Sequence, residues 1–103
     1  GHAPFLGAYP GKGVAKLGIV GFTRGVATDL GQYNITANCI APGHIAVERD
    51  DFQDPNKGKR AGQPIQVDGS SDTIGNLMLL LAAESSYYIT GQVYHANGGS
   101  FFQ

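Results

Sequence analysis

The sequence lacks several features that would define a class of protein. Its one cysteine, Cys39, excludes an internal disulfide framework and an all-cysteine metal site, and suits a reducing cytoplasm. Seven basic and eight acidic residues leave a formal net charge of −1, which gives no electrostatic reason for binding nucleic acid or an anionic membrane. No segment approaches the roughly 20 consecutive apolar residues of a membrane span, and residues 1–4 lack the pattern of a signal peptide. His2, His44 and His95 have no ligand spacing typical of a metal site. We therefore expect a cytoplasmic protein with no metal, nucleic-acid or membrane partner.

Glycine is the residue type in clear excess: the 103 residues include 16 glycines, about twice the usual share. Apolar spacing predicts a helix from about Gly13 to Leu30 with two apolar stripes, where a surface helix has one. The first stripe is Val14, Leu17, Gly18, Gly21 and Gly25, and the second is Ala15, Ile19, Phe22, Val26 and Leu30. Two stripes predict burial on two sides, and the helical glycines predict close approach of another backbone. We expect Gly31 to end the helix in the left-handed conformation.

The rest of the chain alternates between strand and helix patterns. Residues 35–41 predict a buried strand that ends at Pro42-Gly43, and residues 48–70 have the composition of a long loop. A second helix is expected from about Ser71 to Glu84, and a second strand over residues 92–96. Such alternation predicts an α/β fold with parallel strands. Because two strands are marginal alone, the sequence predicts part of a larger sheet; the alternative is a small complete unit that pairs with itself.

Four motifs resemble the second half of a short-chain dehydrogenase/reductase, a family that moves hydride between NAD(P) and an alcohol or carbonyl. The motifs are residues 13–24, Asn38-Cys39-Ile40-Ala41-Pro42-Gly43, Ile89-Thr90-Gly91-Gln92 and Asn97-Gly98-Gly99. The resemblance implies that residues 1–103 are the carboxyl-terminal part of one Rossmann-like domain, a doubly wound parallel sheet without its amino-terminal nucleotide-binding half. The last motif, with His95 two residues before it, is similar to 3-oxoacyl-acyl-carrier-protein reductases.

The resemblance also implies a catalytic pair on the first helix. The family keeps a proton-transferring Tyr four residues before a Lys that lowers the Tyr pKa and holds the cofactor ribose. Lys16 matches that Lys, whereas the Tyr position holds Lys12. Tyr9 is a weaker candidate for the proton donor, because it lies seven residues before Lys16, roughly 10 Å along a helix axis.

The family's cofactor wall, where NAD or NADP would bind, corresponds to the end of the first predicted strand. Pro42, Gly43, His44 and Ile45 match it, and Val47 stands where a Thr hydroxyl is common. Residues 48–70 correspond to the family's substrate-binding segment. The carboxyl-terminal motifs correspond to the part that joins subunits, which implies a homo-oligomer or a homologous subunit as partner.

No complete nucleotide fingerprint accompanies these motifs. Residues 11–16 begin like the glycine-rich dinucleotide loop, but Lys16 stands at the third glycine and we expect no strand before them. Three hypotheses follow: part of an NAD(P)-dependent oxidoreductase acting on a small alcohol or carbonyl and inactive alone, a non-catalytic assembly module of the same fold, or a small self-associating α/β unit.

Overall fold

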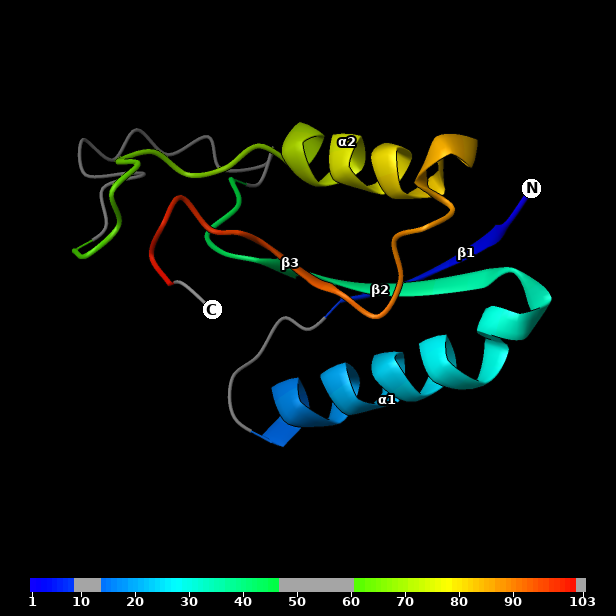
Figure 1. Ribbon diagram of the computed structural model, residues 1–103. Helices are drawn as coiled ribbons and strands as arrows, with labels where there is room; N and C mark the ends of the chain where they lie inside the picture. The colour runs from blue at the N-terminus through cyan, green and yellow to red at the C-terminus, as the bar shows by residue number, and fades with distance from the viewer. Residues whose placement is uncertain (9–13, 47–60, 102–103) are drawn as a thin grey trace.

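The computed structural model describes residues 1–8, 14–46 and 61–101 of the chain (Figure 1). Strand β1 spans Ala3–Ala8, helix α1 Val14–Leu30 and strand β2 Ile35–Pro42. Helix α2 spans Ser71–Ala82 and strand β3 Val93–Ala96, with short 3-10 helices at Gly31–Tyr33 and Glu84–Ser86. The predicted α/β class and the helix and strand positions after residue 13 are confirmed to within two residues, an ordinary uncertainty for element ends.

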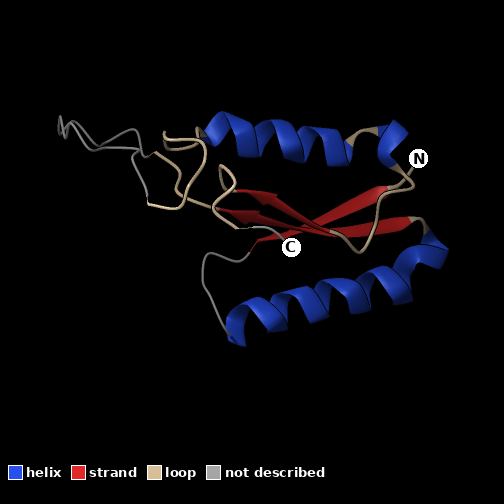
Figure 2. Ribbon diagram, turned by 60° about the vertical axis from the view of Figure 1, so that its left-hand side comes forward, coloured by secondary structure: helices blue, strands red, loops and turns tan. Residues whose placement is uncertain are grey.

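The strands form one parallel sheet in the order β1-β2-β3. Pairing of β1 with β2 runs from Ala3 opposite Ile35, and pairing of β2 with β3 runs from Cys39 opposite Val93. Helix α1 covers one face of the sheet and α2 covers the other (Figures 1 and 2). This three-layer arrangement is a partial doubly wound fold, as the resemblance implies.

Strand β1 corrects the expectation of a two-stranded sheet. Residues 3–8 contain Pro4 and Gly7 and lack a clear alternation of apolar and polar residues, so the pattern does not indicate a strand. Pro4 is accommodated because β1 is an edge strand within the described residues, bonded on one side only, to β2. The expectation that no strand precedes residues 11–16 is therefore also wrong, because β1 ends at Ala8.

Helix α1 buries one face and leaves the other open within the described part of the chain. Val20 and Thr23 are buried against the sheet, where Val20 joins Cys39 and Ala41 in the small core. On the open face Leu17 is 73% exposed, and Phe22 is 62% exposed although its ring meets Phe5 of β1 with centroids 6.0 Å apart. A Cβ placed on Gly18, Gly21 or Gly25 would meet no described atom within 4 Å. Burial on both sides of the helix and close approach of another backbone are thus not observed among the residues that the structure describes.

The end of α1 also differs from expectation. The chain continues from Leu30 into the 3-10 turn Gly31–Tyr33, and the left-handed residue is Asn34, with a φ of 61°. The Asn34 amide donates to the Gly31 carbonyl oxygen and completes this cap. Asparagine tolerates the left-handed region better than most residues, so it fills the position that glycine was expected to occupy.

Candidate functional site at the carboxyl ends of the strands

A cavity of about 420 Å³ lies where β2 and β3 end. Residues from three segments line it: His44 and Ile45 after β2, residues 95–99 at the end of β3, and Gln63, Ile65 and residues 67–70 before α2, with Thr73 of α2. The predicted cofactor-wall residues His44 and Ile45 are therefore part of one pocket. Ligands of open α/β sheets bind beyond this edge of the sheet, which makes this cavity the candidate functional site.

Gly43 allows the ends of β2 and β3 to meet. Its amide donates to the Ala96 carbonyl oxygen at 2.9 Å. A Cβ at position 43 would lie 2.8 Å from Asn97 Cα, closer than real Cβ contacts. Glycine is required here because the two backbones touch, and this contact sets the spacing of the pocket rim.

The predicted substrate segment returns to β2 in its described part. Ile45 and Gly69 form a parallel bridge, in which the Ala46 amide donates to Gly69 O and the Gly69 amide donates to His44 O, both at 2.8 Å. Residues 61–70 therefore form a wall of the pocket. Residues 48–60 of the same segment lie outside the described residues.

The buried side chain of Gln63 holds residues 61–70 together by hydrogen bonds to their backbone. Its side chain is buried and its Nε2 donates to the carbonyl oxygens of Ile65 and Val67. Gly98, with a φ of 63°, brings its backbone against this amide, and the Ile65 amide donates to Gly98 O at 2.9 Å. The Asn-Gly-Gly motif thus joins the end of β3 to the predicted substrate segment, a role that sequence analysis did not assign.

Lys16 reaches the pocket through an aromatic contact. Its Nζ lies 4.3 Å from the centroid of the Phe101 ring, within cation–π range. The same ring meets the His95 imidazole edge-on, with centroids 5.4 Å apart. Because His95 lines the pocket, Phe101 connects Lys16 of α1 to the pocket wall. Sequence analysis missed Phe101, because this contact joins residues far apart in the chain.

The remaining predicted site residues divide into two groups. Pro42 and Gly43 are half-buried at the end of β2, His44 is exposed and Ile45 is half-buried. Lys12, Tyr9 and Val47 lie outside the described residues, so the proposed proton-donor position stays a prediction. No cluster of potential metal ligands occurs among the residues that the structure describes.

Asn38 has a structural role at the other end of this strand pair. Its buried side chain donates to Ile89 O at 3.0 Å, and its Oδ1 accepts from the Gln92 amide at 3.1 Å. Thr90 Oγ1 accepts from the Ala37 amide at 2.9 Å. Two of the recognised motifs therefore fasten the chain before β3 onto β2.

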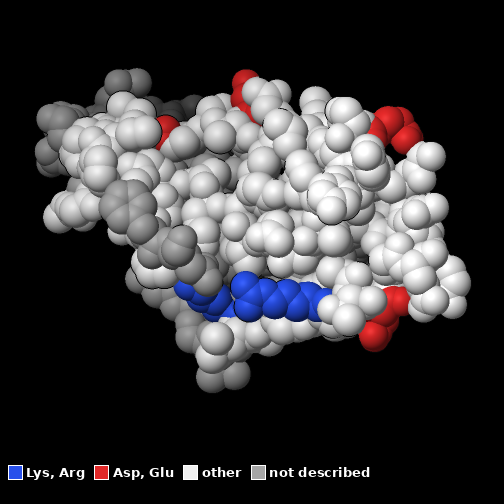
Figure 3. Space-filling model, viewed as in Figure 1, with Lys and Arg blue, Asp and Glu red and all other residues white. Residues whose placement is uncertain are grey.

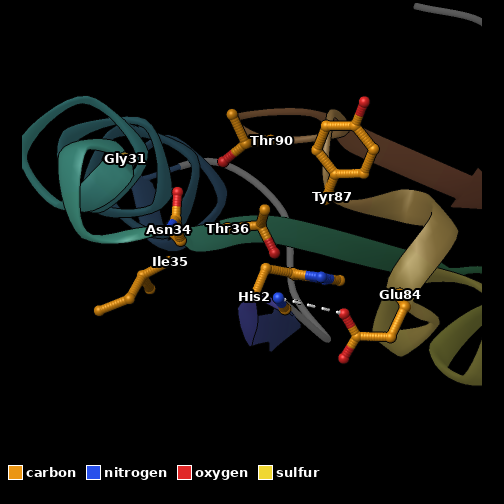
Figure 4. Close-up of a pocket in the computed structure, with 9 residues that line it drawn as sticks. His2, Gly31, Asn34, Ile35, Thr36, Glu84, Tyr87 and Thr90 are labelled. Carbon is orange, nitrogen blue, oxygen red and sulfur yellow. Dashed lines mark ion pairs between the residues drawn. The ribbon is translucent and has the colours of Figure 1, made fainter.

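A second cavity, of about 250 Å³, lies at the opposite edge of the sheet (Figure 4). There the Thr36 hydroxyl points towards His2, and the Gly1 ammonium lies 3.7 Å from the Glu84 carboxylate. This edge carries the amino ends of β1 and β2, away from the rim where ligands of such sheets bind. We therefore place the functional site at the cavity beyond the carboxyl ends of β2 and β3.

Comparison with known proteins identifies the family. A family model described as enoyl-(acyl carrier protein) reductase matches residues 4–100. The chain belongs to the short-chain dehydrogenase/reductase family, and the resemblance of its motifs to the carboxyl-terminal half of such a protein is confirmed.

Individual relatives agree with this assignment. The chain is 42% identical over 88 residues to (2S)-((R)-hydroxy(phenyl)methyl)succinyl-CoA dehydrogenase subunit BbsD of Thauera aromatica, which covers 82% of this chain. It is 38% identical over 88 residues to a 3-oxoacyl-(acyl-carrier-protein) reductase of Aquifex aeolicus, which covers 84% of it. The chain spans about 35% of the length of these relatives.

A solved structure supports the fold. The acetoin dehydrogenase of Salmonella typhimurium matches 96% of this chain with a TM-score of 0.75 and 29% identity. The match spans 44% of that protein. None of the helices in the described part of this chain is long and apolar enough to cross a membrane.

Proposed function

We propose that this chain forms the nicotinamide-side and substrate-side part of an oxidoreductase that interconverts a small alcohol and a carbonyl compound, such as a 3-oxoacyl thioester, with NAD or NADP. The observation that carries the proposal is the pocket at the carboxyl ends of β2 and β3, which contains His44 and Ile45. Membership of an oxidoreductase family supports the same reaction class.

The described residues fit only half of such a cofactor. By the family resemblance, Lys16 would offer an ammonium to ribose hydroxyls, and the backbone at Pro42, Gly43, His44 and Ile45 would form a wall for a nicotinamide ring. Val47, which lies outside the described residues, has no hydroxyl group to donate a hydrogen bond to the cofactor. A bound nicotinamide would give or take the hydride, while the protein would orient it and move the proton. In the sequence, Lys16 stands where the third glycine of a dinucleotide-binding loop would be, and we expect no saturable NADPH binding at micromolar concentration by this chain alone.

Position 12 argues against turnover. Lys12 cannot reproduce a neutral phenol that donates a proton beside the Lys16 cation. We therefore propose that the chain is catalytically inactive with Lys12 at this position.

A second candidate function is a non-catalytic assembly module, kept for association with itself or with an active homologue. The observation that favours it is the open face of α1, where Leu17 and Phe22 are largely exposed. Both candidate functions use the same fold. They differ in whether a proton donor placed at position 12 restores oxidoreductase activity.

The test is a chimera that joins the amino-terminal part of a 3-oxoacyl-(acyl-carrier-protein) reductase to this chain. With Lys12 we expect no NADPH oxidation above background in the presence of a 3-oxoacyl thioester. Lys12→Tyr is expected to raise the rate at least about 100-fold, the usual contribution of a general acid. Lys12→Phe, which supplies the ring without the hydroxyl, is the matched control and should stay inactive. Equal turnover by the unchanged chimera and its Lys12→Tyr variant would show that position 12 is not the proton donor.

A further inference from the structure

Phe101 stands between two site residues that belong to separate elements. Its ring lies under Lys16 Nζ of α1 at 4.3 Å and against the His95 imidazole of β3 at 5.4 Å between centroids. We propose that Phe101 is an aromatic latch, a side chain that restricts the access of ligand hydroxyl groups to the Lys16 ammonium. The identity of that ligand rests on the proposed function, whereas the contact itself does not.

The Phe101 ring and a ligand hydroxyl group compete for the same side of the Lys16 ammonium. An ammonium 4.3 Å from a ring centroid is attracted by the negative face of the ring, which occupies one side of the charge. Lys16 is half-buried, which limits the directions from which a hydroxyl group can approach. A hydroxyl oxygen that arrives from the side of Phe101 must displace the ring.

The turn after β3 carries Phe101 back over α1. Gly98 and Gly99 have positive φ angles of 63° and 84°, and the Asn97 side chain holds the turn closed. Asn97 Nδ2 donates to Phe101 O, and Asn97 Oδ1 accepts from the Gly99 amide, both at 3.0 Å. The backbone of the latch is therefore fixed, while the ring is 47% exposed and can swing away from Lys16.

The first experiment measures the accessibility of Lys16 without any ligand. The chain is treated with limiting acetic anhydride, and peptide mass spectrometry gives the acetylation of Lys16 relative to Lys57 and Lys59. Phe101→Ala is expected to raise Lys16 acetylation about two- to fivefold, because that range corresponds to a partly exposed cation–π contact. Phe101→Tyr keeps the ring and should behave like the unchanged chain.

Two further variants separate the latch from less specific effects. Phe101→Leu retains apolar cover without a π face, so it should resemble Phe101→Ala; protection equal to that by Phe would overturn the cation–π basis. Tyr88 is 88% exposed and contacts Tyr87, so Tyr88→Ala is the control and should leave Lys16 unchanged. Unchanged Lys16 acetylation in both the Ala and Leu variants, with native circular dichroism spectra, would overturn the latch.

The second experiment repeats the labelling with millimolar NADPH in the chimera described under the proposed function, because the chain alone is expected to bind the cofactor weakly. We expect NADPH to protect Lys16 more strongly in Phe101→Ala than in the unchanged chain. Weaker protection in Phe101→Ala would make the ring a support for the ligand and overturn the latch. Increased acetylation without protection by NADPH in any variant would retain the latch and overturn the proposed cofactor role of Lys16.

Discussion

Cys39 is fully buried in the centre of β2, where it packs with Val20 and Ala41 in the core. Desolvation by burial raises the pKa of its thiol, because the thiolate is disfavoured away from water. A raised folded-state pKa contributes stability that is fully present below the unfolded pKa of about 8.5 and is lost as the pH rises through the folded value.

We therefore predict that the free energy of unfolding falls as the pH rises above about 8.5, and that Cys39→Ala flattens this dependence. Urea unfolding at several pH values measures both, with the Ala variant as the control for the titration of other groups. Ellman's reagent should react slowly with the native thiol and fast in urea. Rapid reaction of the native protein would contradict the burial of Cys39.

At the scale of single residues, part of the site could be predicted from the sequence. Pro42-Gly43 and Asn97-Gly98-Gly99 interrupt apolar patterns with residues that turn the chain, and both lie at the pocket rim or end of a strand, as expected. The contact of Lys16 with Phe101 could not be predicted, because it depends on the return of the carboxyl-terminal segment over α1. The residues next to Lys16 or Phe101 in the sequence give no sign of this contact.

At the scale of elements, periodicity predicted α1, β2, α2 and β3 because each has a long or strongly apolar pattern. Ser70 caps α2, its hydroxyl oxygen accepting from the Asp72 amide. Strand β1 could not be predicted, because its strand conformation is imposed by pairing with β2 and its own residues have weak strand preference. The open face of α1 could not be predicted either, because periodicity indicates apolar surface and does not say what covers it.

The attachment of residues 89–92 to β2 gives an element-scale prediction. Asn38→Ala removes both side-chain hydrogen bonds and leaves the Ile89 carbonyl and the Gln92 amide without this partner. We expect a loss of about 2–4 kcal/mol in the free energy of unfolding, measured by urea denaturation. Asn76→Ala, on the exposed side of α2, is the matched control and should change stability by less than about 0.5 kcal/mol. Equal effects of the two variants would contradict the fastening role of Asn38.

At the scale of the whole molecule, apolar side chains remain exposed on both helices. Leu17 and Phe22 are exposed on α1, and Met78, Leu79 and Leu80 are exposed on α2. Basic side chains of the described residues gather along α1 (Figure 3), and they belong to Lys16 and Arg24. The apolar area beside them is of the kind that interaction surfaces present.

We predict that the chain self-associates through the open face of α1. Light scattering after size exclusion should give a mass above that of the 103-residue monomer at tens of micromolar. Leu17→Glu with Phe22→Glu should shift the protein towards the monomer, because two carboxylates would have to be desolvated in the interface. The control is Thr28→Glu, which adds a negative charge at an exposed position on α1 without removing apolar surface. A monodisperse monomer over a broad concentration range would contradict this prediction.

The parallel sheet has a consequence for the order in which the chain assembles. No two strands of the described residues are joined by a hairpin, so every strand pair forms only after a long segment has been closed. Ala3 meets Ile35 across the single helix α1, whereas Cys39 meets Val93 across the predicted substrate segment, α2 and the turn that follows it. Because closing the shorter loop costs less entropy, the β1–α1–β2 unit should form first and β3 should join last. The pocket rim between Gly43 and Asn97 would then be completed in the final step. A kinetic intermediate of this chain would have β1 paired with β2, while the pocket at the end of β3 would not yet have formed.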